Sequence, residues 1–180
     1  MAQTRSIGLI DNLQYTNAMD FFGAYTNHTT ADYFRNVGGN SGNIAFIRGS
    51  RQCLQADTIR MTWGSHPEWV RRNISHIVIC CANQIGSHVD LGTWADALDR
   101  LDLPVTLIGL GAQTTNYESE VEVPIGTRRF LEAVERCRPG SSTNIGARGQ
   151  FTKSVLGKHG IAAAPIGCPS LFISSRVRLG

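Results

Sequence analysis

The chain has 180 residues, 42% of them hydrophobic and 17% charged, with a formal net charge of +3. This composition excludes a disordered chain, and the longest apolar runs are too short to span a bilayer. The net positive charge is small, and the sequence has no cluster of basic residues typical of a nucleic-acid-binding surface, so we expect no nucleic-acid partner. The first residues have no signal-peptide layout, which predicts a cytoplasmic protein with no transmembrane segment.

The first half of the chain gives few regular patterns. Residues 6–10 form a predicted strand, whereas residues 12–40 are polar and aromatic with no clean period. A helix is expected from Asn43, with Asn40, Ser41 or Asn43 as its cap. The predicted inward face of this helix consists of Ile44, Ile47, Arg51 and Leu54. Residues 57–63 are a further strand candidate.

The second half alternates between strands and helices. Strands are predicted at 75–83, 105–111, 142–149 and 161–167, and helices between them at 93–102, 126–137 and 150–160. Thr93 is the expected N-cap of the first of these helices, and Gly160 the C′ glycine of the last. Inward-facing positions are Phe130, Leu131, Val134 and Cys137 in one helix and Phe151, Val155 and Leu156 in the next. The order predicts an α/β fold with a Rossmann-like, mainly parallel sheet and helices on both faces.

The strand at 105–111 runs into Gly-Leu-Gly, which invites comparison with a dinucleotide-binding turn. That fingerprint needs a third glycine and a helix that opens directly at the turn. Here Thr114 stands at the third position, and the residues that follow include β-branched side chains and a proline. No helix is expected there to present N–H groups to a pyrophosphate, so the dinucleotide interpretation fails.

Polar side chains follow several of the predicted strands. They are Asn83, Gln84, Gln113, Arg148 and Ser170. Ligands of open α/β sheets bind outside the carboxyl ends of the strands, and amides suit hydroxyl-rich ligands because they both donate and accept. Each residue alone also fits a plain polar strand cap, but their joint placement indicates a site.

Three segments together resemble the polysaccharide pyruvyl transferase family. The first is GNSGNIA at 39–45, similar to the family's Asn-x-Gly-Asn helix start. The second is LPVTLIGLGAQ at 103–113, similar to its Leu-Pro segment that ends in Gly-x-Gly-Ala-Gln. The third runs from IGARGQF at 145 to IGCPSLF at 172 and joins an Arg-Gly helix start to Gly-Cys-Pro-Ser. The likeness covers roughly residues 36 to 175.

The resemblance implies two facing Rossmann-like domains, as in glycosyltransferases of the B type. It also implies transfer of pyruvate from phosphoenolpyruvate to a sugar as a ketal, in exopolysaccharide, capsule or cell-wall glycan biosynthesis. Residues 1–180 would then be a single domain of half length, whose partner is a C-terminal domain or a second copy. Phosphoenolpyruvate is a substrate here, so no further cofactor is expected. Two alternatives stay open, namely a nucleotide-sugar-dependent glycosyltransferase and a non-catalytic glycan-binding half-domain.

Candidate site residues follow from this chemistry. Phosphoenolpyruvate is an anion, and Arg148 before a helix start would bind it, with a structural ion pair as the alternative role. Asn40, Gly42 and Asn43 hold the first helix start tight and would face a phosphate or sugar. Gly111 keeps its strand end narrow beside Gln113. Further hypotheses are sugar stacking by Trp63, proton transfer by His66, His76 or His88, and a plain turn role for Cys168. The cysteines and histidines show no metal-ligand spacing, so no metal site is expected.

Overall fold

The computed structural model describes residues 5–11, 29, 31, 34–35, 37, 39–54, 56–114 and 120–173, and most of the aperiodic stretch 12–40 lies outside them. The strands are β1 (Ser6–Ile10), β2 (Thr58–Met61), β3 (Ile74–Cys80), β4 (Asn83–Ile85), β5 (Val105–Ala112), β6 (Ile145–Ala147) and β7 (Ala164–Pro165). The helices are α3 (Gly42–Leu54), α4 (Pro67–Asn73), α5 (Gly92–Leu101), α6 (Ile125–Arg136) and α7 (Gln150–Lys158), followed by the 3₁₀ helix η1 (Pro169–Phe172).

The strands form one parallel sheet, which confirms the predicted α/β fold. Its order is β2-β1-β3-β5-β6-β7, and β4 pairs with the end of β5. Every pairing between these strands is parallel. All carboxyl ends therefore lie at one edge of the sheet, which we name the carboxyl edge.

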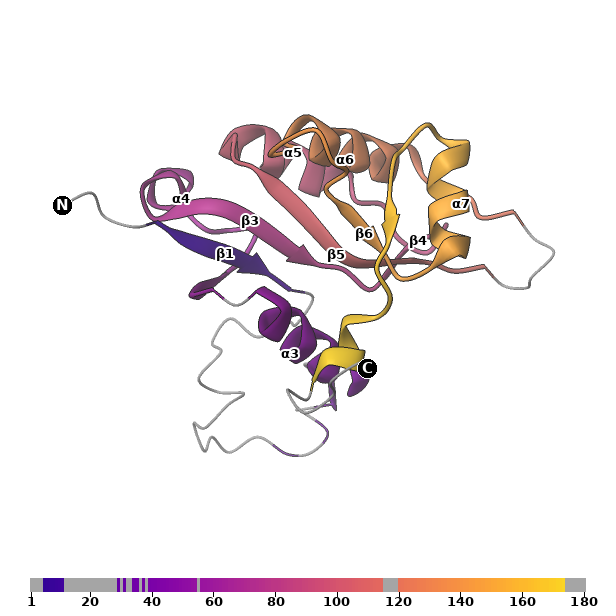
Figure 1. Cartoon of the computed structure of the whole chain (residues 1–180), viewed down its shortest axis with the longest axis horizontal. Helices are drawn as coiled ribbons and strands as arrows, with labels where there is room; N and C mark the ends of the chain where they lie inside the picture. The colour runs from indigo at the N-terminus through magenta and orange to yellow at the C-terminus, as the bar shows by residue number, and fades with distance from the viewer. Residues whose placement is uncertain are drawn as a thin grey trace.

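The strand order determines which face each helix covers. The chain moves one way along the sheet from β1 to β2 and the opposite way from β2 through β7. Because crossovers between parallel strands are right-handed, α3 lies on one face and the later helices lie on the other. Figure 1 shows α5 and α6 on one side of the sheet and α3 on the other. The prediction of helices on both faces is thus confirmed.

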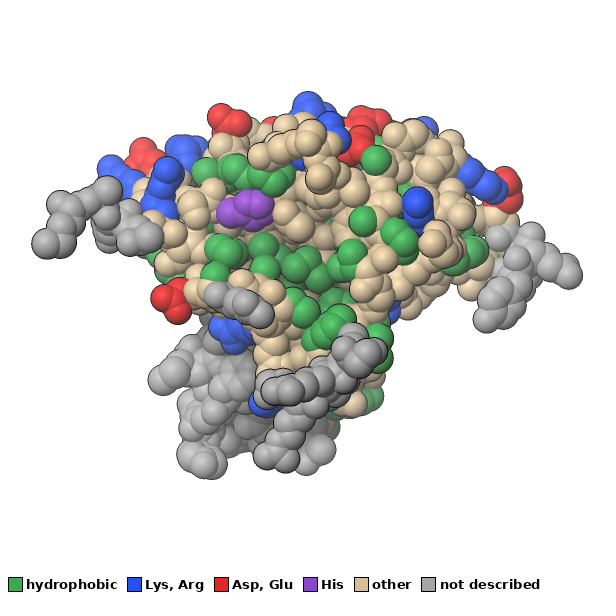
Figure 2. All heavy atoms as spheres, viewed as in Figure 1, with side chains coloured by type: hydrophobic (Ala, Val, Ile, Leu, Met, Phe, Trp, Pro, Cys, Tyr) green, Lys and Arg blue, Asp and Glu red, His purple; other side chains and the backbone are tan. Residues whose placement is uncertain are grey.

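Two apolar clusters follow from this layering. The larger one joins the sheet to α4, α5, α6 and α7 and contains Phe130 and Leu131. The smaller one lies under α3, where Phe46 and Ile47 pack on Leu9, Val78 and Cys80. In Figure 2, hydrophobic side chains gather across the middle of the visible face, between the α5–α6 layer and α3.

Helix α3 packs on two neighbours, which changes its predicted inward face. Its buried residues are Phe46, Ile47, Gly49 and Ser50, whereas Ile44, Arg51 and Leu54 are only half-buried. Gly49 lies directly against the backbone of Pro169 in η1, and a Cβ there would overlap that carbonyl. The predicted face came from the spacing of residues along the helix, which does not include the contact with η1, and it is rotated from the observed face.

Two predicted positions in the later helices are wrong. Thr93 does not cap α5, whose N-cap residue is Leu91. The preceding Asp90 accepts from Gly92 N through Oδ1 at 2.8 Å and from Gly126 N through Oδ2 at 3.2 Å. Phe151 is 48% exposed, and its neighbour Thr152 is buried instead. The Thr152 hydroxyl accepts from Ala112 N at 3.0 Å, which satisfies a backbone donor at the end of β5.

Strand bounds differ from the predictions where the chain bends. The predicted strand 75–83 ends as β3 at Cys80, with only its last residue in β4, and β7 has only two residues of the expected 161–167. Pro165 lacks the N–H that a longer ladder would need. Gly160 has φ of +75° after α7, as the predicted C′ glycine requires. Within the described residues, no helix has both the length and the apolarity needed to cross a membrane.

Candidate functional site

Three of the expected site residues meet at the carboxyl edge. Asn83 begins β4 and lies opposite Gly111 of β5 in the strand register. Arg148 comes directly after β6, and its backbone N–H donates to Leu110 O at 2.8 Å. The ends of three neighbouring strands therefore place Asn83, Gly111 and Arg148 side by side, although 65 residues separate Asn83 from Arg148 in the chain.

Neutral groups fix the Arg148 side chain. Its Nε donates to Gly109 O at 3.0 Å, and its Nη1 donates to Asn83 Oδ1 at 3.0 Å. The guanidinium carbon lies 5.2 Å from the centre of the Phe46 ring on α3, a cation–π distance. We name these three groups, the Gly109 carbonyl, the Asn83 amide and the Phe46 ring, the Arg148 cradle. Arg148 forms no ion pair with any described carboxylate, so the alternative role of a structural ion pair finds no described partner.

The two glycines of Gly-Leu-Gly make room for this cradle. A Cβ on Gly109 would overlap the Phe46 ring, and it would lie 2.9 Å from Pro169 Cδ. A Cβ on Gly111 would overlap Asn83 Oδ1 and lie 3.4 Å from Arg148 Cδ. The motif is therefore needed for side-chain packing around an arginine.

The start of α3 uses its asparagines locally. Asn40 Oδ1 accepts from Gly42 N at 2.9 Å, and Asn43 Nδ2 donates to Val37 O at 2.7 Å. These bonds make the tight helix start that the sequence predicts. Gly42 lies four residues before Phe46, so the two share one face of α3 and the helix start lies one turn from the cradle.

The other three expected site residues, Gln113, Gln84 and Ser170, differ in how far they are buried. Gln113 is exposed, and its backbone N–H donates to Ile85 O at 2.9 Å. Gln84 is half-buried, and its Oε1 is buried without a hydrogen bond from any described residue. Ser170 lies in η1, where its Oγ is 3.0 Å from Cys168 Sγ. None of these three side chains is among the described hydrogen-bond partners of the Arg148 side chain, which are Gly109 O and Asn83 Oδ1.

His88 is a neighbour of the cradle that the sequence did not single out. Its Nε2 lies 2.7 Å from Asn83 O. A carbonyl only accepts, so Nε2 carries the hydrogen and Nδ1 of the neutral ring is the acceptor. His76 bonds Thr106 Oγ1 on the sheet face, and His66 lies at the N-cap of α4. Among these three histidines, only His88 is tied to a cradle residue.

Trp63 is partly buried, and the core occupies one face of its ring. Its ring stacks on Trp94 with 4.9 Å between centroids, and it meets Phe130 edge-on at 6.4 Å. All three rings belong to or pack on the larger core cluster. The hypothesis of sugar stacking by Trp63 placed this residue in an open loop, whereas the core holds one of its faces.

The cysteines near the carboxyl edge do not provide a nucleophile. Burial raises the pKa of Cys80 to about 12 and raises the pKa of Cys81 as well. Both thiols therefore stay protonated at neutral pH. Cys168 contacts a hydroxyl and no described base, in keeping with the turn role expected for it. In the part of the chain that the structure describes, no three His, Cys, Asp or Glu side chains gather as metal ligands.

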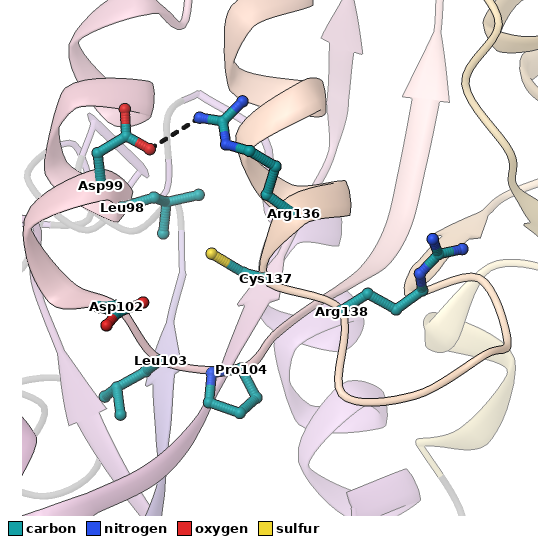
Figure 3. Close-up of a pocket in the computed structure, with 8 residues that line it drawn as sticks. All are labelled: Leu98, Asp99, Asp102, Leu103, Pro104, Arg136, Cys137 and Arg138. Carbon is teal, nitrogen blue, oxygen red and sulfur yellow. Dashed lines mark hydrogen bonds and ion pairs between the residues drawn. The ribbon is translucent and has the colours of Figure 1, made fainter.

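A hollow of about 400 Å³ lies at the opposite edge of the sheet, between the ends of α5 and α6. Figure 3 shows Arg136 pointing toward Asp99, with Arg136 Nη2 2.8 Å from Asp99 Oδ1. Burial raises the pKa of Cys137, the one thiol in the hollow. The Cys137 thiol is protonated and the Arg136 charge is already paired, so neither group is free to react with or bind a ligand.

Comparisons with protein-family models, with curated protein sequences and with solved structures found no match. The class of the site therefore rests on geometry. The site has two features. Arg148 is held by neutral groups at the carboxyl edge. Helix α7 starts two residues later, and its N-cap residue Gly149 has no side chain to cap the first N–H groups. Such an arrangement is suited to bind an anion with carboxylate or phosphate oxygens.

Proposed function

We propose that this chain is a pyruvyl transferase-type protein, which moves pyruvate from phosphoenolpyruvate to a sugar of a polysaccharide as a ketal. The observation that carries the proposal is the charge of Arg148, which the cradle holds in place and which no described carboxylate pairs with. The resemblance of 39–45, 103–113 and 145–172 to the pyruvyl transferase family supplies the reaction.

Arg148 and the start of α7 would bind the donor. Phosphoenolpyruvate carries a carboxylate and a phosphate, and the fork of a guanidinium matches both. The first N–H groups of α7 lack a side-chain cap, so they are open to an anion as well. Exposed amides such as Gln113 would lie on the side of the saccharide, whose hydroxyls both donate and accept.

The reaction needs two sugar hydroxyls and proton transfers. One hydroxyl gives up its proton as its oxygen adds to C2 of phosphoenolpyruvate, while C3 takes up a proton. The second hydroxyl oxygen then displaces phosphate from C2 and gives up its proton. We assign proton transfer to His88, because its ring is oriented by the carbonyl of the residue that holds Arg148.

Thermal unfolding with and without phosphoenolpyruvate tests the donor site. A ligand that binds only the folded state, at about 100-fold above its Kd, stabilises it by about 2.7 kcal/mol. For a chain of this size, that corresponds to a rise of roughly 5–10 °C in the unfolding midpoint. We expect this rise in the wild-type protein and its loss in Arg148→Ala.

Arg138→Ala is the matched control, because Arg138 is exposed and lies in the hollow at the other edge of the sheet. It removes the same charge and should leave the rise intact. An equal loss in both variants would mean a general charge effect and would contradict the donor site. A rise with nucleotide sugars and none with phosphoenolpyruvate would instead favour a nucleotide-sugar-dependent glycosyltransferase.

A further inference from the structure

We propose that Asn83 is a positioning residue that orients the Arg148 guanidinium without cancelling its charge. This inference rests on the proposed function and deepens it, since it makes the amide of Asn83 a determinant of anion affinity. Its starting point is the 3.0 Å hydrogen bond from Arg148 Nη1 to Asn83 Oδ1. An aspartate would make the same bond, so the choice between amide and carboxylate decides the charge of the site.

A second arginine in the sheet shows the opposite arrangement. Arg60 of β2 binds Asp11 through two hydrogen bonds, Nε to Oδ2 at 2.9 Å and Nη2 to Oδ1 at 3.0 Å. Both side chains are well buried, at 12% and 2% exposure, so the Arg60 charge is cancelled inside the fold. Arg148 has an amide, a carbonyl and an aromatic ring where Arg60 has a carboxylate.

The glycine at 111 is required for this amide to reach Arg148. Any Cβ at that position would overlap Asn83 Oδ1, so a larger residue would displace the amide from its bond. Gly109 does the same for the Phe46 ring below the guanidinium. Both glycines thus serve the orientation of a single side chain.

The oriented guanidinium keeps donors for a ligand. Arg148 Nη2 donates no hydrogen bond to any residue that the structure describes, while Nε and Nη1 are held by the cradle. Arg148 is half-buried, so part of its side chain remains accessible to solvent at the carboxyl edge. A carboxylate or phosphate with two oxygens is the ligand class that such an edge binds.

Two variants separate orientation from charge. Asn83→Asp keeps the acceptor and adds a negative charge, so Arg148 should stay ordered while the affinity for phosphoenolpyruvate falls by about tenfold or more. Asn83→Ala removes the acceptor, so Arg148 should become mobile and the affinity should fall about fivefold to tenfold. Asn73→Asp on α4 is the control, because it introduces the same negative charge at another asparagine position. The Asn73 amide donates to Trp69 O, and this substitution should leave the affinity for phosphoenolpyruvate unchanged.

Two measurements are made on each variant. Calorimetric titration with phosphoenolpyruvate, and separately with inorganic phosphate and pyruvate, gives the affinity for the anion and for its parts. Relaxation of the Nε–H signals in ¹⁵N NMR gives the order of the Arg148 side chain, with the Arg60 signal as an internal reference for an intact sheet. A residue with only a structural role would lower stability on substitution and leave the affinity of the folded protein unchanged.

The results separate this proposal from the proposed function. Wild-type affinity in Asn83→Asp, or wild-type order of Arg148 in Asn83→Ala, would overturn the positioning role. If the wild-type protein binds phosphate or pyruvate but not phosphoenolpyruvate, the proposed function fails and the titrations with those probes still test Asn83. If it binds none of them, the anion role of the site is wrong, and the NMR comparison decides the orientation by itself.

Discussion

The backbone of Gly109 offers a stringent test of the cradle. Gly109 lies within β5 and has φ of +75°, a left-handed conformation that favours glycine. The register of β5 with β6 shifts between Ile108 and Leu110, so this residue forms an irregularity in the ladder. An added Cβ would overlap the Phe46 ring and lie 2.9 Å from Pro169 Cδ. Gly109→Ala therefore adds backbone strain and a steric clash together.

Both contributions have known sizes. The left-handed conformation costs an L-residue about 1–2 kcal/mol. Forcing a methyl group into packed surroundings costs about 1–3 kcal/mol more. We therefore expect Gly109→Ala to lower the free energy of unfolding by about 2–5 kcal/mol, a large part of the ~5–15 kcal/mol typical of a domain. The unfolding midpoint should fall by about 4–20 °C.

Urea unfolding of three variants separates strain from clash. Gly160 has the same φ of +75°, and a methyl group there would meet no atom within 4 Å, so Gly160→Ala should cost about 1–2 kcal/mol from strain alone. Gly157 lies in α7 with open space around it, and Gly157→Ala should stabilise by about 0.5–1 kcal/mol. If Gly109→Ala cost no more than Gly160→Ala, the close packing of Phe46 and Pro169 on Gly109 would be wrong.

Two further predictions concern histidines. Burial lowers the pKa of His76 below its ordinary value of 6.5. The His76 ring therefore binds a proton more readily in the unfolded chain than in the folded one, and the free energy of unfolding falls as the pH drops below about 6.5. His76→Gln should reduce this acid loss in urea unfolding between about pH 7.5 and about pH 5.5, and an unchanged pH profile would contradict the effect. His88→Gln should lower phosphate release from phosphoenolpyruvate with saccharide acceptors by about 10²–10⁴-fold. The rise in midpoint with phosphoenolpyruvate should persist in that variant, and wild-type release would remove His88 from the proton transfer.

Much of the fold follows from local pattern. The runs at 75–83 and 105–111 are mainly apolar, as is typical of strands buried on both faces, and they contain most of β3 and β5. Helix α4 escaped prediction because seven residues with Val70 as their one buried side chain give no period to detect. Strand β4 escaped because its three residues pair only with the far end of β5, a contact that no local pattern encodes.

The candidate site was predictable in part for a topological reason. Parallel strands bring their carboxyl ends together, so Asn83, Gly111 and Arg148 were expected at one edge and do meet there. Phe46 was not predicted, because its place under Arg148 depends on how α3 packs across the sheet. Asn40 and Asn43 were expected to hold the start of α3 tight, and their side chains do so by bonding a free N–H group and a nearby carbonyl. That this helix start faces a ligand stays a prediction.

The Gly-x-Gly of β5 shows how one short pattern serves different chemistry. In a dinucleotide-binding turn, glycines let the backbone approach a pyrophosphate, and the helix that follows supplies N–H groups. Here β5 ends at Ala112 without a helix directly after it, and the space left by the glycines is filled by Phe46 and Asn83. Those two side chains hold the Arg148 guanidinium, the group to which the proposed function assigns anion binding. A glycine pair at a strand end therefore indicates a close approach, and what approaches must be found from the neighbouring strands.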